Sequence, residues 1–106
     1  MSYWAEGKGT LALNDYGKSH IDVLYEIISY DFNHEINGDS LHISFYGDYN
    51  EHEIIEALKD ISKFVEKEQA VYFYGEAHDV WRFVFKKDGL YEENAEIVWI
   101  TPGSKR

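Results

Sequence analysis

The spacing of the apolar residues switches several times along the chain between a helical period and a strand period, and these switches constrain the fold more than any other feature. Apolar residues recur at intervals of three and four in one early stretch, which predicts a helix over 20–32. A second stripe of the same kind predicts a helix over 51–66. Apolar and polar residues alternate in three stretches, one between these helices and two after them, which predicts strands over 40–46, 70–75 and 80–86.

Short polar signals mark where these elements begin and turn. Ser19 stands three residues before Asp22, a pattern like a capping box at the start of the first helix. Asn50 and Glu53 repeat this spacing at the start of the second helix. The dipeptide 88–89 is Asp-Gly, which favours a tight hairpin in which both residues occupy the central positions with positive φ.

The order of these elements predicts the fold class. A weakly alternating stretch predicts a first strand over 3–13, Asn-Gly-Asp marks a turn at 37–39, and a final strand runs over 90–100 with a break at Asn94. The order is therefore β-α-β-α-β-β-β. We expect a single α+β domain over 1–106, with two helices packed on one face of a mostly antiparallel sheet, ferredoxin-like or a relative of that fold.

The net charge of −10 is concentrated in the first half of the chain. Residues 14–56 carry a net charge of −9, whereas residues 1–13 carry 0 and residues 57–106 carry −1. Such a field repels nucleic acid and anionic membranes and attracts basic proteins over a long range. A surface that only keeps the protein in solution is the alternative interpretation.

The first predicted helix carries the clearest acidic pattern. Asp22 and Glu26 are four residues apart, so they lie on the same face and repel each other, and no lysine on that helix offsets them. A row of carboxylates can imitate DNA phosphates. We therefore predict a partner-binding negative surface made of Asp15, Asp22, Glu26, Tyr30, Asp31, Glu35, Asp39 and Asp48.

The segment GEAHD, between two aromatic stretches, raises the question of a metal or proton-transfer site at Glu76, His78 and Asp79. Three ligands from one short loop rarely converge, because metal sites draw ligands from separate elements. We interpret the segment as the bend of a hairpin. The chain has no cysteine and no serine-nucleophile motif. We therefore expect no metal, no cofactor and no catalytic residues.

One face of the predicted sheet carries polar and aromatic side chains that the helices leave uncovered. Cross-strand packing alone, contact with another protein, and base stacking on RNA are all compatible with this composition. The net charge of −10 opposes the last of these. The residues predicted on this face are His42, Tyr46, Tyr72, Tyr74, Arg82 and Tyr91.

The N-terminal residues MSYWAEGKG do not resemble a signal peptide, and no apolar run approaches the roughly 20 residues of a membrane span. The absence of cysteine fits a reducing compartment. We expect a cytoplasmic protein.

The segment 72–99, about a quarter of the chain, resembles a hairpin found in small acidic proteins of phages and other mobile elements. The pattern is a strand, Gly-Glu, an acidic link, Trp-Arg-aromatic, a glycine turn and a closing strand. The matching residues are Gly75, Glu76, Trp81, Arg82, Phe83 and Gly89. Proteins of this kind look ferredoxin-like and include inhibitors of host defence, among them anti-CRISPR proteins.

The resemblance and the acidic half together predict a non-enzymatic inhibitor of a host defence system. Its partner would be a basic, nucleic-acid-handling protein such as a CRISPR effector, bound through the acidic and DNA-mimicking surface. Two alternatives stay open. One is a small-ligand or enzyme module with a pocket under the aromatic hairpin, and the other is a homodimeric structural protein paired through its sheets.

Overall fold

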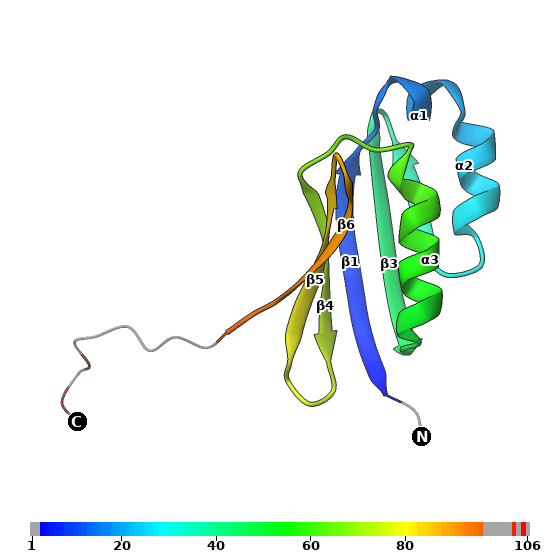
Figure 1. Cartoon of the computed structure of the whole chain (residues 1–106). Helices are drawn as coiled ribbons and strands as arrows, with labels where there is room; N and C mark the ends of the chain where they lie inside the picture. Colours follow the sequence, from blue (N-terminus) through cyan, green and yellow to red (C-terminus); the bar gives the residue numbers. More distant parts are fainter. Residues whose placement is uncertain (1–2, 97–102, 104, 106) are drawn as a thin grey trace.

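The computed structural model describes residues 3–96, 103 and 105, and they form an α+β fold (Figure 1). Six antiparallel strands make one open sheet in the order β2-β3-β1-β4-β5-β6. Three helices lie together on one face of the sheet. The elements are β1 (Trp4–Ala12), α1 (Asp15–Ser19), α2 (Ile21–Ile28), β2 (Asn33–Asn37), β3 (Ser40–Asp48), α3 (Glu51–Ser62), β4 (Gln69–Gly75), β5 (Val80–Lys86) and β6 (Gly89–Asn94).

Helix α3 confirms its predicted start and ends four residues before its predicted end. The Asn50 side chain accepts a hydrogen bond from the Glu53 backbone N–H at 3.1 Å and caps the helix. The residues after Ser62 leave the helix because the end of β1 offers other partners. Val65 forms an isolated bridge with Leu13, and residue 66 donates its backbone N–H to the carbonyl of residue 12.

The first predicted helix corresponds to α2 alone, its predicted cap is wrong, and α1 before it was not predicted. Ser19 is the last residue of α1 and donates its hydroxyl to the carbonyl of Asp15, so it does not cap α2. His20 is the N-cap of α2 and makes no side-chain capping bond. Helix α2 also ends at Ile28 rather than at residue 32, because the chain turns there to enter β2.

Strand β2 was not predicted, and it changes the expected element order. Its pattern is weak because only His34 and Ile36 turn toward the helices, and neither is fully buried. The strand pairs with β3 through the turn predicted at 37–39, where Gly38 has a φ of 64°. That left-handed conformation favours glycine, so the turn signal was correct although the strand before it was missed.

The core lies between the helices and the sheet. A glycine in β1, Gly7, pairs with Phe45 on one side and with Phe73 on the other. A Cβ at Gly7 would overlap the Phe73 ring, so the missing side chain lets the two phenylalanine rings approach to 6.3 Å over β1. The alternation in the predicted strands 40–46, 70–75 and 80–86 places one set of apolar residues toward the helices, and these are buried or half-buried: Leu41, Ile43, Phe45, Val71, Phe73, Trp81, Phe83 and Phe85.

The C-terminal strands form the two predicted hairpins, with one error of register. The β5–β6 hairpin pairs Lys86 with Gly89, so Lys87 and Asp88 are its central residues rather than Asp88 and Gly89. Gly89 has a φ of 151°, and neither central residue has a positive φ. Strand β6 ends at Asn94, where the break was predicted, and positions 97–100 of the predicted last strand lie outside the described residues.

Candidate functional site

Five of the eight predicted binding residues lie on α1, α2 and the turn that follows α2. Asp22 and Glu26 are both exposed and stand one turn apart on α2. Tyr30 is 95% exposed, and Asp31 beside it is half-buried. Asp15 is exposed at the start of α1. The helical layer therefore carries a run of carboxylates and one exposed tyrosine. We call Asp22, Glu26, Tyr30 and Asp31 the α2 surface.

The other three predicted residues do not join the α2 surface. Glu35 and Asp48 lie on β2 and β3 and alternate with inward residues, so they face away from the helices. Asp39 lies at the β2–β3 turn, and Lys18 of α1 approaches it to 3.8 Å. The expectation of one shared patch is therefore wrong for these three residues, because the sheet separates two of them from α2 and a lysine offsets the third.

The electrostatics of α2 are unfavourable to the helix itself. Asp22 stands in the first turn, where the helix dipole favours an anion. Glu26 stands in the last turn, where the dipole favours a cation, and that turn holds no basic residue. Among the described residues the ion pairs are Lys18 with Asp39 and Arg82 with Glu93, so neither Asp22 nor Glu26 is in one. These two charges are available to a partner.

The face of the sheet that the helices leave uncovered, called the open face here, carries the six residues predicted for it. All six are exposed: His42, Tyr46, Tyr72, Tyr74, Arg82 and Tyr91. The open face also carries exposed residues of β1 that were not predicted, among them Trp4, Glu6 and Lys8. Their signal was the alternation of these residues with Ala5 and Gly7, which is weak because small residues replace large apolar ones on the inward side.

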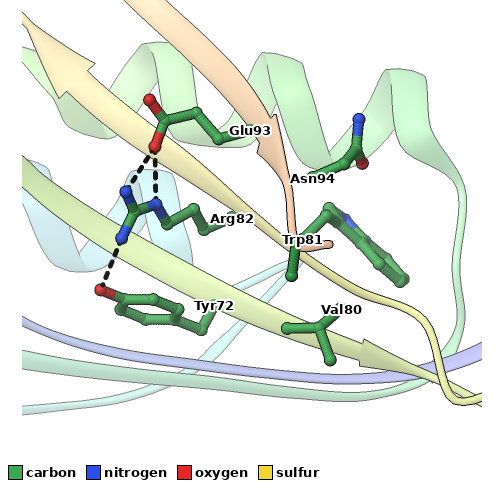
Figure 2. A pocket seen from close by; sticks show the side chains of 7 residues that line it. Tyr72, Val80, Trp81, Arg82, Glu93 and Asn94 are labelled. Carbon is green, nitrogen blue, oxygen red and sulfur yellow. Dashed lines mark hydrogen bonds and ion pairs between the residues drawn. The ribbon is translucent and has the colours of Figure 1, made fainter. Parts of the chain in front are cut away.

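A row of paired side chains crosses the open face near its middle. Lys8 pairs with Tyr72, Tyr72 with Arg82, and Arg82 with Glu93. Arg82 donates its Nε to Glu93 at 2.6 Å and one terminal nitrogen to the Tyr72 hydroxyl at 3.3 Å, so it lies between them (Figure 2). These hydrogen bonds, the Glu93 bond first, raise the pKa of Arg82. The guanidinium is thus held within the chain.

A hollow of 440 Å³ lies beside this row, between β4, β5 and the end of β6 (Figure 2). Arg82, Glu93 and Tyr72 line it on one side, and Trp81 and Val80 on the other. Its volume falls in the range of roughly 300–1,000 Å³ typical of small-ligand sites. Arg82 and Glu93 are hydrogen-bonded and ion-paired to each other, so fewer of their donor and acceptor positions are available to a ligand.

The segment GEAHD forms the bend between β4 and β5, as predicted. His78 has a φ of 66°, and its N–H donates to the carbonyl of Gly75 at 3.0 Å. Glu76 accepts from the backbone N–H of Trp4 at 2.9 Å, and Asp79 accepts from the Tyr3 hydroxyl. The Asp79 hydrogen bond is the largest cause of a raised Tyr3 pKa. Both acids fasten the bend to the first strand, and within residues 3–96 no three potential ligands gather as a metal would need.

Two carboxyl groups approach each other where α3 begins beside β6. The pKa of Glu92 is raised, first by desolvation and then by the neighbouring Glu51 carboxyl group. Next to them, the half-buried Tyr49 accepts from the Trp81 indole N–H at 3.2 Å. Burial raises the pKa of Tyr49 to about 12. We assign this cluster no binding role.

Comparisons with known proteins leave the site to be interpreted from its own chemistry. No protein-family model, curated protein or solved structure matches the chain. In the part of the chain that the structure describes, no helix has the length and apolar character needed to cross a membrane.

Proposed function

We propose that this protein is a non-enzymatic inhibitor of a host defence system, which binds a basic, nucleic-acid-handling protein through the α2 surface. The observation that carries the proposal is the exposed pair Asp22 and Glu26, which the described residues leave without a countercharge. Tyr30 adds an almost fully exposed aromatic ring, a residue type enriched at binding hot spots. The surface thus combines charge that steers a basic partner with a side chain that can anchor it.

The spacing of the carboxylates supports the DNA-mimicking form of the proposal. Residues one turn apart on a helix are separated by about 6 Å along its axis. Phosphates on one DNA strand rise about 3.4 Å per step along the axis and also wind round it. Neighbouring phosphates are therefore separated by clearly more than that rise, and the two carboxylates can substitute for a neighbouring pair. The surface that competes with nucleic acid is then α2 with its following turn, rather than all eight residues first predicted.

The fold and the resemblance supply the biological setting of the proposal. If α1 and α2 are taken as one helical segment, the first four strands and the helices between them follow the order β-α-β-β-α-β. We interpret the whole as a relative of the ferredoxin-like fold with two added strands. Small acidic proteins of phages and mobile elements with a similar C-terminal hairpin include anti-CRISPR proteins. We therefore propose a CRISPR effector as the partner, in the cytoplasm of the host.

An inhibition assay tests the proposal. A panel of purified CRISPR effector complexes is assayed for target-DNA binding and cleavage with and without the protein. We expect inhibition of one class of effector, and loss of inhibition in the double variant Asp22→Lys, Glu26→Lys. The matched control is Glu66→Lys, Glu68→Lys, which changes the net charge equally at exposed positions of the α3–β4 loop. Equal inhibition by both double variants would refute the role of α2.

A second function is favoured by the 440 Å³ hollow beside Arg82. We infer that a small ligand there would contact Tyr72 and Val80 and would have to displace or share Glu93. A thermal-shift screen of a metabolite library tests this candidate. A compound that stabilises the wild type but not Tyr72→Ala would support it, and a screen without any such compound would count against it.

A further inference from the structure

A second cluster of aromatic and acidic side chains lies on the open face, near the bend that joins β4 to β5. Trp4 and Glu6 come from β1, Tyr46 from β3, Tyr74 from β4 and Glu76 from the bend. Together with adjoining backbone they surround a hollow of 230 Å³. We call these five residues the aromatic box. None of them belongs to the α2 surface or to the row around Arg82.

The strand register brings the members of the box together. Glu6 is paired with Tyr46 in β3 and with Tyr74 in β4, so a tyrosine stands on each side of its carboxylate. The Trp4 ring lies 5.7 Å from the Tyr46 ring at an angle of 68°. The Glu76 carboxylate is fixed at the rim because it accepts from the backbone N–H of Trp4 at 2.9 Å. The arrangement is therefore set by the sheet and not by a flexible loop alone.

The box leaves large aromatic surfaces in contact with water. The exposed fractions are 49% for Trp4, 73% for Tyr46 and 46% for Tyr74. Among the described residues, no ion pair engages Glu6 or Glu76. Lys8, the nearest basic residue along β1, is paired instead with Tyr72 and Ser44 in the next row. Cross-strand packing alone does not require exposed rings beside carboxylates that have no ion-pair partner among the described residues.

The chemistry of the box selects a cation. The faces of tryptophan and tyrosine rings attract positive charge. The carboxylates at the rim also favour a cation, because they accept charge-assisted hydrogen bonds from it. The hollow is smaller than the roughly 300 Å³ at which small-ligand pockets begin, so it suits one side chain. A planar guanidinium can stack on an aromatic ring while it donates to a carboxylate, which a lysine ammonium cannot do in the same way.

We propose that the aromatic box binds an arginine side chain on an exposed segment of the partner protein. This inference rests on the proposed function only in taking the partner to be basic, since the box and the α2 surface are separate. The two sites together would bind a basic protein at two places. The α2 surface attracts it over a long range, and the aromatic box contacts one of its arginines.

An NMR titration of the ¹⁵N-labelled protein with the acetylated, amidated tripeptide Gly-Arg-Gly tests the proposal. We expect saturable shifts of the Trp4 indole N–H and of the Tyr46 and Tyr74 amides. The same peptide with citrulline in place of arginine is neutral but similar in shape, and we expect no saturable shift with it. The Gly-Lys-Gly peptide is expected to bind more weakly, and tighter binding of the lysine peptide would overturn the choice of arginine.

Variants separate the box from general acidity. Trp4→Ala and Glu6→Gln should each weaken binding of the arginine peptide about fivefold or more, as loss of a cation–π contact or of a charged acceptor predicts. Glu35→Gln removes another open-face charge outside the box and should leave binding unchanged. Because Tyr46 is 73% exposed, Tyr46→Ser provides a second variant with little risk to the fold.

The outcomes distinguish this inference from the proposed function. Shifts confined to the amides of α2, or equal shifts with the citrulline peptide, would overturn the box and leave the α2 proposal standing. Binding at the box combined with full inhibition by the Asp22→Lys, Glu26→Lys variant would overturn the α2 proposal and leave the box standing. Absence of any saturable shift with the arginine peptide would overturn the inference.

Discussion

The substitution Glu26→Lys should stabilise the protein while it weakens partner binding. It removes a like-charge pair with Asp22 four residues away and creates an attractive pair in the favourable orientation, each worth about 0.2–0.5 kcal/mol. It also replaces an anion with a cation in the last turn of α2, which contributes about 0.3–1 kcal/mol. These terms act at an exposed site, so we expect a gain of about 1 kcal/mol and a rise in Tm of about 5 °C.

Thermal and urea unfolding, followed by tryptophan fluorescence, measure this gain. The matched variant is Asp22→Lys, which places a cation in the first turn of α2, where the dipole opposes it, and should leave stability nearly unchanged. Both variants replace an acidic residue of α2 with lysine, so a difference in their stability reports the position of the charge along the helix. If Glu26→Lys were no more stable than the wild type, the view that Glu26 is kept at a cost to the fold would be wrong.

Three further predictions concern the fold and its titrating groups. Gly17→Ala should lower Tm by about 10 °C, because a Cβ there would overlap the carbonyl oxygen of Phe64 and overpacking costs about 1–3 kcal/mol; an unchanged Tm would contradict this packing. Spectrophotometric titration should show Tyr49 ionising at about 12, and stability should fall as pH rises from 10.0 toward 12, since only the unfolded chain loses that proton at the lower value. Glu92→Gln should raise stability at neutral pH and much less in acid, because desolvation first, and then the neighbouring Glu51, raise the pKa of Glu92 and make its ionised form unfavourable; equal gains at both pH values would exclude this cause.

The elements that sequence analysis predicted correctly have strong, continuous patterns. The alternation through β3, β4 and β5 identified both the core residues and the exposed ones, because each strand has one face on the helices and one face in water. The Asn50 cap of α3 was predicted because a single side-chain hydrogen bond determines it. These features are local, and local chemistry was enough to recognise them.

The missed features depend on contacts between distant parts of the chain. Helix α1 has only five residues, and the Asn14 side chain at its start reaches the carbonyls of Lys63 and Val65, which lie far along the sequence. The aromatic box likewise depends on the register that places Tyr46 and Tyr74 on either side of Glu6. No pattern within one segment contains that information.

The same limit explains why the predicted acidic surface was too large. Charge along the sequence identified an excess of carboxylates in residues 14–56, and α2 does present the expected row. The alternation of β2 and β3 turns Glu35 and Asp48 to the opposite side of the sheet. Asp39 meets Lys18 because the β2–β3 turn lies beside α1. The sequence gives the number of charged residues, but the face on which each one lies depends on the topology of the sheet.

The salt dependence of partner binding tests the central claim most directly. Binding of the wild type to an inhibited CRISPR effector is measured at rising salt concentration, beside Asp22→Lys, Glu26→Lys and the control Glu66→Lys, Glu68→Lys. If the α2 carboxylates bind the basic partner, affinity falls steeply with salt for the wild type and the control, and the α2 variant binds weakly with a flatter dependence. An affinity that is indifferent to salt, or an α2 variant that binds like the control, would contradict the account.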